Sequence, residues 1–422
     1  MQLSLFDIRK PMLSKNLEAS ASPSSVLKLD ELFEAYFECR KNKRYTANAL
    51  AFEIDYEHNL VQLCKEINNG TYQIGKSIAF VVDKPVKREI FAADFRDRVV
   101  HHLIIGKLNN LFEKQFIHDS YSCRVGKGTY FGIQRIDKFI RQCSHNYTKD
   151  CYILKLDIQG FFMSINKNIL YQKLEKFITD KYTATDKEIL LKLSKQVIYN
   201  KPTNNCIIKG SCTDWNDLPL SKSLFHSAVN VGLPIGNLTN QIFANFYMDT
   251  LDHYIKHDLQ IKYYGRYVDD FVIVHNDLEY LKTLIPLLSK YLLSTLELTL
   301  HPKKIYLQHY TKGVKFLGTV ILPNRIYLQD RTVNNFKNSI YNWNIQIRQT
   351  KKLTATEKQE FQSSINSYLG IAKHYNTYNI RQRLLKENVS AYFFNYFYIS
   401  GGYCKLTSKI RRVKNRRNMI TQ

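Results

Sequence analysis

The sequence lacks an apolar segment long enough to span a lipid bilayer. It also lacks an N-terminal run that joins a basic region, an apolar stretch and a small-residue cleavage site. We therefore expect a cytoplasmic protein without a membrane partner. Its eight cysteines form no C-x-x-C pair and have no matching histidine cluster, so neither a zinc site nor a disulfide framework is indicated. We interpret them as reduced thiols, mostly buried.

Acidic residues are also scarce. The chain has 37 Asp and Glu against 61 Lys and Arg, which gives a formal net charge of +24. Such a surplus favours a polyanionic partner, most commonly nucleic acid, although a basic surface also suits a membrane or solubility. The 29 tyrosines and 24 phenylalanines either stack on bases or fill the core. With 44% hydrophobic residues and 422 residues in all, the chain can build a large shared core, and we find no internal repeat or long linker.

The spacing of apolar residues predicts a mixture of helices and strands. Residues 1–25 look like a loosely held lead-in, and helical spacing begins after them and continues to about residue 70. Between 71 and 94, β-branched and aromatic residues flank a turn-like "DKP", which predicts a two-stranded finger. Residues 201–230 are polar and too irregular for one long helix. Short strands are predicted at 150–162 and 298–328, and helices at 97–116, 166–178, 185–200 and 278–297. In 231–257 a Gly/Pro loop opens a long helix, and from 331 the spacing is helical almost to the end, with a capping box from Thr354 to Glu357.

The stretch "YYGRYVDDFVIVH", residues 263–275, sets two aspartates between two apolar runs. We expect a hairpin with strands "YYGRYV" and "FVIVH" and with Asp269 and Asp270 at the turn. An Asp-Asp pair by itself is commonly only a turn. Here both arms read as buried, so they would hold the two charges at the floor of a cleft, where charges need a cation.

A third carboxylate stands in a similar setting far upstream, because Asp157 ends the apolar strand "YILKLD". Three such carboxylates, two of them adjacent and one from a neighbouring strand, would hold two Mg²⁺ ions roughly 3.5–4 Å apart. In phosphoryl transfer one ion activates a 3′-hydroxyl and both neutralise charge on the phosphate under attack. The pattern therefore predicts nucleotide addition.

Seven motifs in the same order resemble those of prokaryotic reverse transcriptases, over about residues 75–390. They read "KREIFAADFRDRVVHHLI", "FIHDSYSCRVGKGTYFGI", "LKLDIQGFF", "VGLPIGNLTNQ", "RYVDDFVIV", "LTLHPKKI" and "VKFLGTVI". The resemblance implies an α+β right-hand polymerase fold with fingers, an antiparallel-sheet palm and a helical thumb. The ranges that it implies are an N-terminal helical extension at 1–75, fingers at 76–150, a palm at 151–328 with a fingers–palm segment at 181–230, a thumb at 329–400 and a basic tail at 401–422.

The same resemblance implies a role for each matching residue. Asp157, Asp269 and Asp270 would be the catalytic metal ligands, joined by the backbone carbonyl of Ile158, and Lys304 would protonate the leaving pyrophosphate. Phe162 matches the steric gate that rejects a 2′-hydroxyl. The residues expected to bind the dNTP are Lys87, Arg88, Phe162, Ile235, Gly236 and Gln241, and those of the primer grip are Phe316, Leu317 and Gly318.

Blander interpretations of these residues remain open from the sequence. Phe161 and Phe162 would both suit a core, Lys87 and Arg88 a solvated strand edge, and Lys304 a surface turn. A glycine after a strand, such as Gly318, fits any hairpin.

The templating motif departs from the usual pattern, because this chain reads Ile235-Gly236 and then Asn240-Gln241. An aliphatic residue before the glycine is similar to reverse transcriptases of diversity-generating retroelements, whose usual serine is here Asn240. Reverse transcriptases of antiviral defence share much of this pattern. Ile235 cannot form a side-chain hydrogen bond near the nascent pair, so weaker polar discrimination is expected there.

The implied partners are an RNA template or non-coding RNA, a DNA product or primer, dNTPs, and an accessory protein or a second copy of the chain. We see no pattern for an RNase H or an endonuclease, so reliance on a dedicated RNA or partner is expected. Two rival hypotheses remain open: an inactive RNA-binding scaffold, and DNA synthesis by the same site without a template or from a protein primer.

Overall fold

The computed structural model describes residues 26–41, 46–83 and 86–409. The predicted lead-in at 1–25 and the predicted basic tail from residue 410 onward lie outside these ranges. Within them the fold is α+β, as predicted: helices surround small sheets whose strands pair mostly antiparallel. No helix of the described residues is long and apolar enough to cross a membrane.

A four-stranded antiparallel sheet forms the centre of the molecule. Its strands are β5 (Tyr264–Tyr267), β6 (Asp270–His275), β3 (Tyr152–Leu156) and β7 (Tyr306–His309), in that spatial order. Alternate residues of β3 and β6 enter two different apolar clusters, one on each face of the sheet. Because both faces are covered, these strands are almost wholly apolar. The sheet is thus a firm platform for groups at its strand ends.

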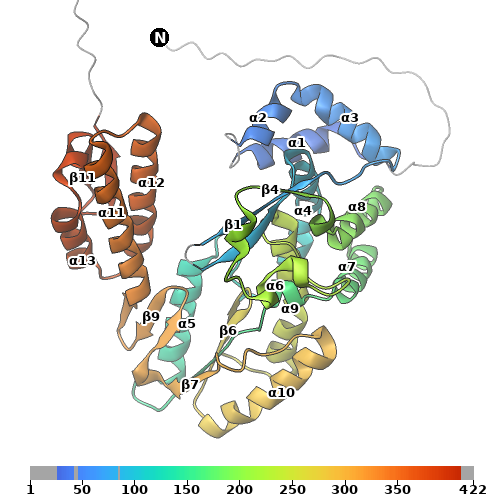
Figure 1. Ribbon diagram of the computed structural model, residues 1–422. Helices are drawn as coiled ribbons and strands as arrows, with labels where there is room; N and C mark the ends of the chain where they lie inside the picture. The colour runs from blue at the N-terminus through green and yellow to red at the C-terminus, as the bar shows by residue number, and fades with distance from the viewer. Residues whose placement is uncertain (1–25, 42–45, 84–85, 410–422) are drawn as a thin grey trace, which may run out of the picture.

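Long helices cover one face of the central sheet. α4 (Phe95–Gln115), α9 (Leu238–His253) and α10 (Leu278–Leu296) share the larger apolar cluster with β3 and β6. α7 (Lys167–Lys181) and α8 (Lys187–Tyr199) join this cluster from the side (Figure 1).

The other face of the sheet is covered by α5 (Thr129–Cys143), which contacts β5 and β6. At the opposite side of the molecule, α1 (Leu29–Arg40), α2 (Ala47–Glu53) and α3 (Tyr56–Asn68) lie on α4, drawn in blue in Figure 1. These helices confirm the helical spacing that begins after residue 25.

A second sheet contains the predicted finger. β1 (Ser77–Val82) and β2 (Arg88–Ala92) pair antiparallel, which confirms the two-stranded prediction. A third strand, β4 (Cys206–Ile208), pairs parallel to β1 and comes from the polar segment for which we predicted no strand. A three-residue strand whose partner lies far away in the chain leaves too short a pattern to recognise.

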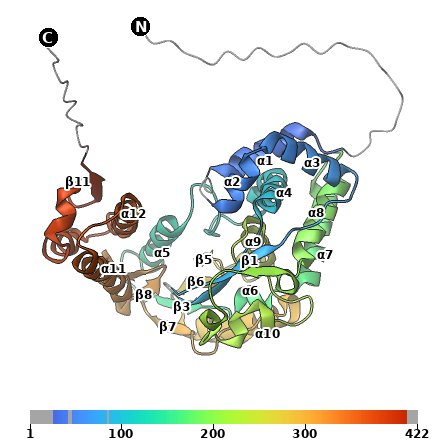
Figure 2. The same ribbon diagram turned by 45° about the horizontal axis from the view of Figure 1, so that its top comes forward.

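The C-terminal part begins with a meander of β8 (Val314–Phe316), β9 (Thr319–Leu322) and β10 (Arg325–Leu328). Its position next to α11 is visible in Figure 2. The helices that follow are α11 (Asp330–Thr350), α12 (Ala355–Ala372) and α13 (Tyr378–Arg383).

The predicted capping box at the start of α12 is confirmed. Thr354 Oγ1 accepts from the backbone N–H of Glu357 at 3.2 Å, and Glu357 Oε2 accepts from that of Thr354 at 2.7 Å. The expectation of helix almost to the end is wrong, because β11 (Phe397–Ser400) and β12 (Lys405–Ser408) form a hairpin. Its buried residues, Phe397 and Leu406, join the apolar cluster of α11 and α12, so packing overrides the local helical spacing.

All eight cysteines are free thiols. Cys39, Cys64, Cys143 and Cys151 are buried, whereas Cys123 and Cys212 are exposed and the other two are intermediate. The prediction of mostly buried thiols is therefore only half right, since Cys123 lies in a turn before α5 and Cys212 begins a short 3₁₀ turn.

Candidate active site

The register of the central sheet brings the predicted carboxylates to one edge. Leu156 at the end of β3 pairs with Phe271 near the start of β6. Continuing this antiparallel register sets Asp157 across from Asp270, with Asp269 next to it. Two segments more than a hundred positions apart in the chain thus bring their charges to the same place.

The turn that carries these charges differs from the prediction by one residue. Tyr267 pairs with Asp270, so the turn consists of Val268 and Asp269, and Asp270 is the first residue of β6. Val268 has a φ of +59°, which a β-branched residue adopts only under outside constraint. The pattern of apolar arms located the hairpin but could not distinguish these two registers.

Arg266 supplies that constraint from beneath the turn. Its guanidinium is fully buried and donates to Val268 O at 2.7 Å, which holds the turn from below. Two further donations, of 2.7 and 2.6 Å, reach the carboxylate of Asp252 on α9. A buried charge needs such a partner, and here the ion pair ties the turn to a core helix.

The three carboxylates influence one another electrostatically. Burial raises the pKa of Asp269 to about 6, and the charge of Asp157 adds to the rise. Burial likewise raises the pKa of Asp270 to about 7, against the lowering effect of Lys155. Like charges in a poorly solvated place disfavour ionisation unless a cation joins them.

Two lysines neutralise this cluster. Lys304 Nζ lies 2.8 Å from Asp157 Oδ1, so the predicted proton donor does reach the carboxylates. Lys155 Nζ lies 3.0 Å from Asp270 Oδ2. The sequence analysis missed Lys155, although its position two residues before Asp157 on a strand places both side chains on one face.

A bound metal ion needs several donor atoms that converge on one point. Among the described residues no three His, Cys, Asp or Glu side chains converge as a ready set of metal ligands, so the predicted gathering is incomplete. Nevertheless Asp270 Oδ1 is buried and has no hydrogen-bond partner. The available donors are carboxylate oxygens, which hard divalent cations such as Mg²⁺ prefer. The donor chemistry therefore fits Mg²⁺. In this structure Lys304 contacts Asp157 and Lys155 contacts Asp270.

The other predicted metal contact, Ile158, is a buried residue that bridges to Leu300 next to the same strand end. The carbonyl of the neighbouring Asp157 accepts from the N–H of His301 at 2.8 Å. The loop before Lys304 is thereby fixed to the end of β3.

Two basic residues that were predicted to bind the dNTP lie at the start of β2 and in the loop before it. The positive charge of Arg88 lowers the pKa of Asp269, which shows that this exposed residue is close to the cluster. Lys87 Nζ instead donates to the carbonyl of Asn216. Arg88 is thus near the cluster, whereas Lys87 is engaged by the polar segment that contains β4.

The two phenylalanines after Asp157 have different surroundings. Both lie in the short helix α6 (Phe161–Ser164), where Phe161 is buried in the main core. Phe162 is only half-buried and packs both against the main core and against a separate small cluster that contains Phe91. The bland interpretation therefore holds for Phe161, while Phe162 has the partial exposure that a gate requires.

The predicted templating loop is fastened to β2. Ile235 O accepts from Phe91 N at 2.9 Å. At Gly236, with a φ of +123°, a Cβ would lie 2.9 Å from Ile90 Cγ2, so both backbone conformation and space require glycine. Asn240, the departure from the usual serine, is buried and donates to Pro234 O at 2.9 Å. Gln241 is exposed and accepts from the thiol of Cys123 at 3.4 Å.

The predicted primer-grip residues form a tight hairpin. Phe316 pairs with Thr319, and Leu317 and Gly318 make the turn with φ values of +46° and +83°. Phe316 is fully buried behind β6, so only the two turn residues are partly exposed. Any contact with a primer would therefore come from the turn.

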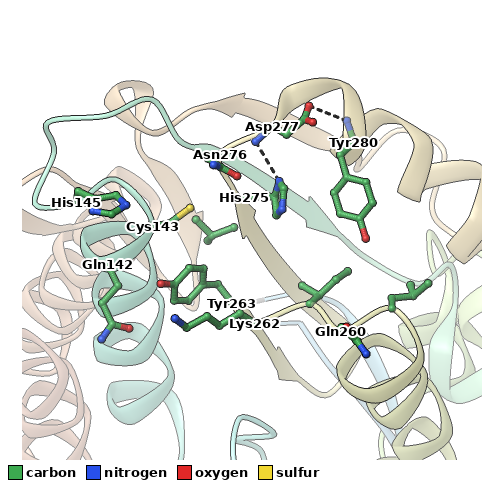
Figure 3. A pocket seen from close by; sticks show the side chains of 13 residues that line it. Gln142, Cys143, His145, Gln260, Lys262, Tyr263, His275, Asn276, Asp277 and Tyr280 are labelled. Carbon is green, nitrogen blue, oxygen red and sulfur yellow. Dashed lines mark hydrogen bonds between the residues drawn. The ribbon is translucent and has the colours of Figure 1, made fainter.

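A separate depression lies at the far end of β6 (Figure 3). It has a volume of about 530 Å³ and is lined by side chains that include Cys143, Tyr263 and His275. His275 Nδ1 accepts from the N–H of Asp277 at 3.0 Å. Because β6 begins at Asp270 and ends at His275, this depression is distinct from the carboxylate cluster.

The family model described as "Reverse transcriptase (RNA-dependent DNA polymerase)" matches residues 84–321 of this chain. No curated protein matches the chain. Among solved structures, apo telomerase of Candida tropicalis truncated from its C-terminal domain aligns with 61% of this chain and 55% of its own, at 12% identity and a TM-score of 0.45.

Telomerase of Candida albicans in complex with a TWJ fragment of telomeric RNA aligns with 80% of this chain and 66% of its own, at 12% identity and a TM-score of 0.43. The chain thus spans between about half and two thirds of the length of these two proteins.

Proposed function

Because the chain belongs to the reverse transcriptase family and is an RNA-directed DNA polymerase, we propose that the site around Asp157, Asp269 and Asp270 adds dNTPs to a 3′-hydroxyl along an RNA template. The observation that supports this most is the pairing of β3 with β6, which places Asp157 across from Asp270. The buried, unpartnered oxygen of Asp270 adds a place for a cation. In this proposal 76–150 are the fingers, 151–328 the palm and 329–400 the thumb.

Asp157, Asp269 and Asp270 would hold two Mg²⁺, with the carbonyl of Ile158 as a further ligand. When bound, the ions would polarise the 3′-hydroxyl and the phosphate that it attacks. Lys304 would then have to leave Asp157, because the carboxylate oxygen that it contacts would become a ligand of the metal ion. A lysine released beside the leaving pyrophosphate is placed to donate a proton to it.

The remaining residues of the site would bind and orient the nucleotide. Lys87 and Arg88 would balance the charge of the triphosphate. Phe162 would close the space that a 2′-hydroxyl needs. Ile235 and Gly236 would lie against the nascent base pair. Gln241, in the first turn of α9, would also contact the dNTP.

The turn of Leu317 and Gly318, behind which Phe316 is buried, would hold the primer end. The apolar clusters on both faces of the sheet would exclude water from the rear of the site.

We propose further that the enzyme works in the cytoplasm with a dedicated RNA, in a retroelement or an antiviral defence system. The net charge of +24 supports an RNA partner, because basic residues bind phosphate backbones without regard to sequence. The Ile235-Gly236 pair supports a diversity-generating or defence subgroup by resemblance. Purification with nuclease and high salt tests the RNA partner, and the absence of any specific co-purifying RNA contradicts it.

The polymerase test supplies purified protein, Mg²⁺ and four dNTPs, with and without a defined RNA template and primer, and sequences the product. Complementary DNA is expected. A simple repeat made without added RNA would instead indicate template-independent or protein-primed synthesis by the same site.

The double variant Asp269→Ala with Asp270→Ala should abolish every mode of synthesis. Asp150→Ala is the matched control, because Asp150 is an exposed carboxylate at the other end of β3. Retained synthesis in the double variant, at the level of the control, would refute the assignment of the site and leave a binding scaffold as the better description.

A further inference from the structure

The segment 206–226, part of the predicted fingers–palm segment, connects the small sheet to the candidate site. It begins in β4, where Ser77 pairs with Cys206 and Lys209 N donates to Ala79 O at 2.8 Å. Short 3₁₀ turns at Cys212–Trp215, Leu220–Lys222 and Leu224–His226 follow. The segment therefore starts at the outer strand of the sheet and returns to β2 at the opposite edge.

Glu89 on β2 fastens the returning part. Its carboxylate is fully buried and accepts from Trp215 Nε1 at 2.7 Å, from Ser223 Oγ at 2.8 Å and from the Leu224 N–H at 2.6 Å. A buried carboxylate is costly unless donors surround it, and three donors from one segment make this a specific anchor. The anchor lies directly after Arg88 in the chain.

The same segment touches the loop that carries the gate. Leu224 is buried with Phe91 in one small apolar cluster, and Phe162 is partly buried and packs against this cluster. The carbonyl of Ser221 would lie 3.1 Å from a Cβ at Gly160, two residues before Phe162. Figure 2 draws β1 and α6 near the ends of β3 and β6, at the centre of the molecule. Leu224 thus belongs to the cluster against which the gate ring packs, and it lies one residue after the Ser223 hydroxyl that Glu89 holds.

We propose that the segment 206–226, anchored by Glu89, forms the rear wall of the sugar pocket and holds the Phe162 ring against the incoming nucleotide. Glu89 is then a positioning residue for the choice of deoxynucleotides over ribonucleotides. This rests on the proposed polymerase function and on Phe162 as its gate. An unsupported ring can move back by part of an ångström, and a gate works only if its own side chain is locked in place.

The test measures kcat/KM for a dNTP and for the matching rNTP on one RNA template, and compares their ratio among variants. Leu224→Ala removes the side chain behind the ring and leaves a cavity into which it can withdraw. Glu89→Gln replaces one acceptor oxygen by a donor, so at least one donor of the segment loses its partner. Each change should lower the ratio by about tenfold, through faster use of the rNTP rather than slower use of the dNTP.

Two further variants keep the test decisive. Trp215→Phe removes a single hydrogen bond to Glu89 and keeps an aromatic ring at this partly buried position, so it should lower the ratio in the same direction by a smaller factor. It decides the matter if Leu224→Ala does not fold. Glu53→Gln is the matched control, because Glu53 is paired with Arg40 at 2.6 Å in the N-terminal helices, far from the site in the fold. Its ratio should equal that of the wild type.

Phe162→Ala separates the possible failures. If Phe162→Ala loses the preference for dNTP over rNTP, Phe162 is the gate. If the three other variants fold and keep the wild-type ratio of kcat/KM, the role of the segment 206–226 as a rear wall is refuted. If Phe162→Ala itself keeps the ratio, the gate assignment is wrong and the proposal falls with it, while DNA synthesis by the wild type still supports the polymerase function.

Discussion

Lys155 Nζ lies 3.0 Å from Asp270 Oδ2, so a residue of β3 neutralises a carboxylate on the neighbouring strand, two positions before Asp157. This ion pair lowers the pKa of Asp270, which burial has raised to about 7. A lysine that belongs to none of the predicted roles therefore counteracts part of the effect of burial on Asp270.

Replacing this lysine should shift the pH dependence of synthesis. Without the positive charge of Lys155, the pKa of Asp270 rises further, and less of the carboxylate is ionised at a given pH. In Lys155→Met the acidic limb of the rate profile, at limiting Mg²⁺, should move upward by about one pH unit. Activity lost at pH 7 should return at higher pH. Lys155→Arg keeps the charge and should keep the profile, and superimposable profiles for all three proteins would contradict this role.

Lys304 should affect the chemical step more than binding. It is largely exposed and reaches Asp157 with its ammonium group, so its removal should leave the fold intact. Loss of a general acid typically lowers a rate by about 10²–10⁴-fold. Single-turnover kinetics should therefore show a lower rate for Lys304→Met with little change in the apparent affinity for dNTP. The neighbouring Lys303→Met is the control, and equal rates for both variants would refute the assignment.

Gly236→Ala should damage the templating loop. Its φ of +123° is unfavourable for alanine, and the new Cβ would lie 2.9 Å from Ile90 Cγ2. We expect the KM for dNTP to rise and the free energy of unfolding to fall by about 1–3 kcal/mol. The control is Gly106→Ala, at an exposed position within α4. A Cβ added there would meet no neighbouring atom within 4 Å, so this change should leave the free energy of unfolding unchanged or raise it. An unchanged KM in Gly236→Ala would show that the loop does not contact the nucleotide.

Acid should weaken the packing of α4 on α9 through His101. This histidine is buried beside Thr239, and burial lowers its pKa to about 3. In the unfolded chain it binds a proton below its ordinary pKa near 6.5, so its contribution to stability is complete at higher pH and declines as the pH falls from 6.5 towards 3. Between pH 6.5 and pH 5 the loss should be about 1.5 kcal/mol.

His101→Gln cannot titrate, and the difference between its unfolding free energy and that of the wild type isolates this histidine from all other groups. Urea unfolding at several pH values measures both proteins. Parallel pH dependences would show that His101 does not carry the effect.

Local patterns predicted much of the fold. The hairpin of β5 and β6 and the finger of β1 and β2 pair segments that are neighbours in the chain, so alternation and turn residues suffice to find them. The capping box at Thr354 is equally local. In contrast, β4 is too short to show a period, and the hairpin of β11 and β12 follows helical spacing that tertiary packing overrides.

The candidate site divides in the same way. Motif order pointed to Asp157, Asp269 and Asp270, because carboxylates at the ends of apolar strands are visible in the residues themselves. Lys155 and Glu89 were missed, since a single charged residue in a strand gives no signal until its partner is known. The one-residue difference in the turn, Val268 with Asp269 instead of Asp269 with Asp270, depends on hydrogen bonds that no composition reveals.

By itself the sequence determined which residue types are present for chemistry, the order of the motifs and the strands that end in carboxylates, because these depend on identity and short spacing. Only the tertiary structure decided that Lys155 pairs with Asp270, that Arg266 supports the turn, and that Glu89 meets donors 126 to 135 residues away. The physical reason is that such contacts form between segments distant in the chain, whose meeting is decided by the burial of the whole core and not by any local pattern.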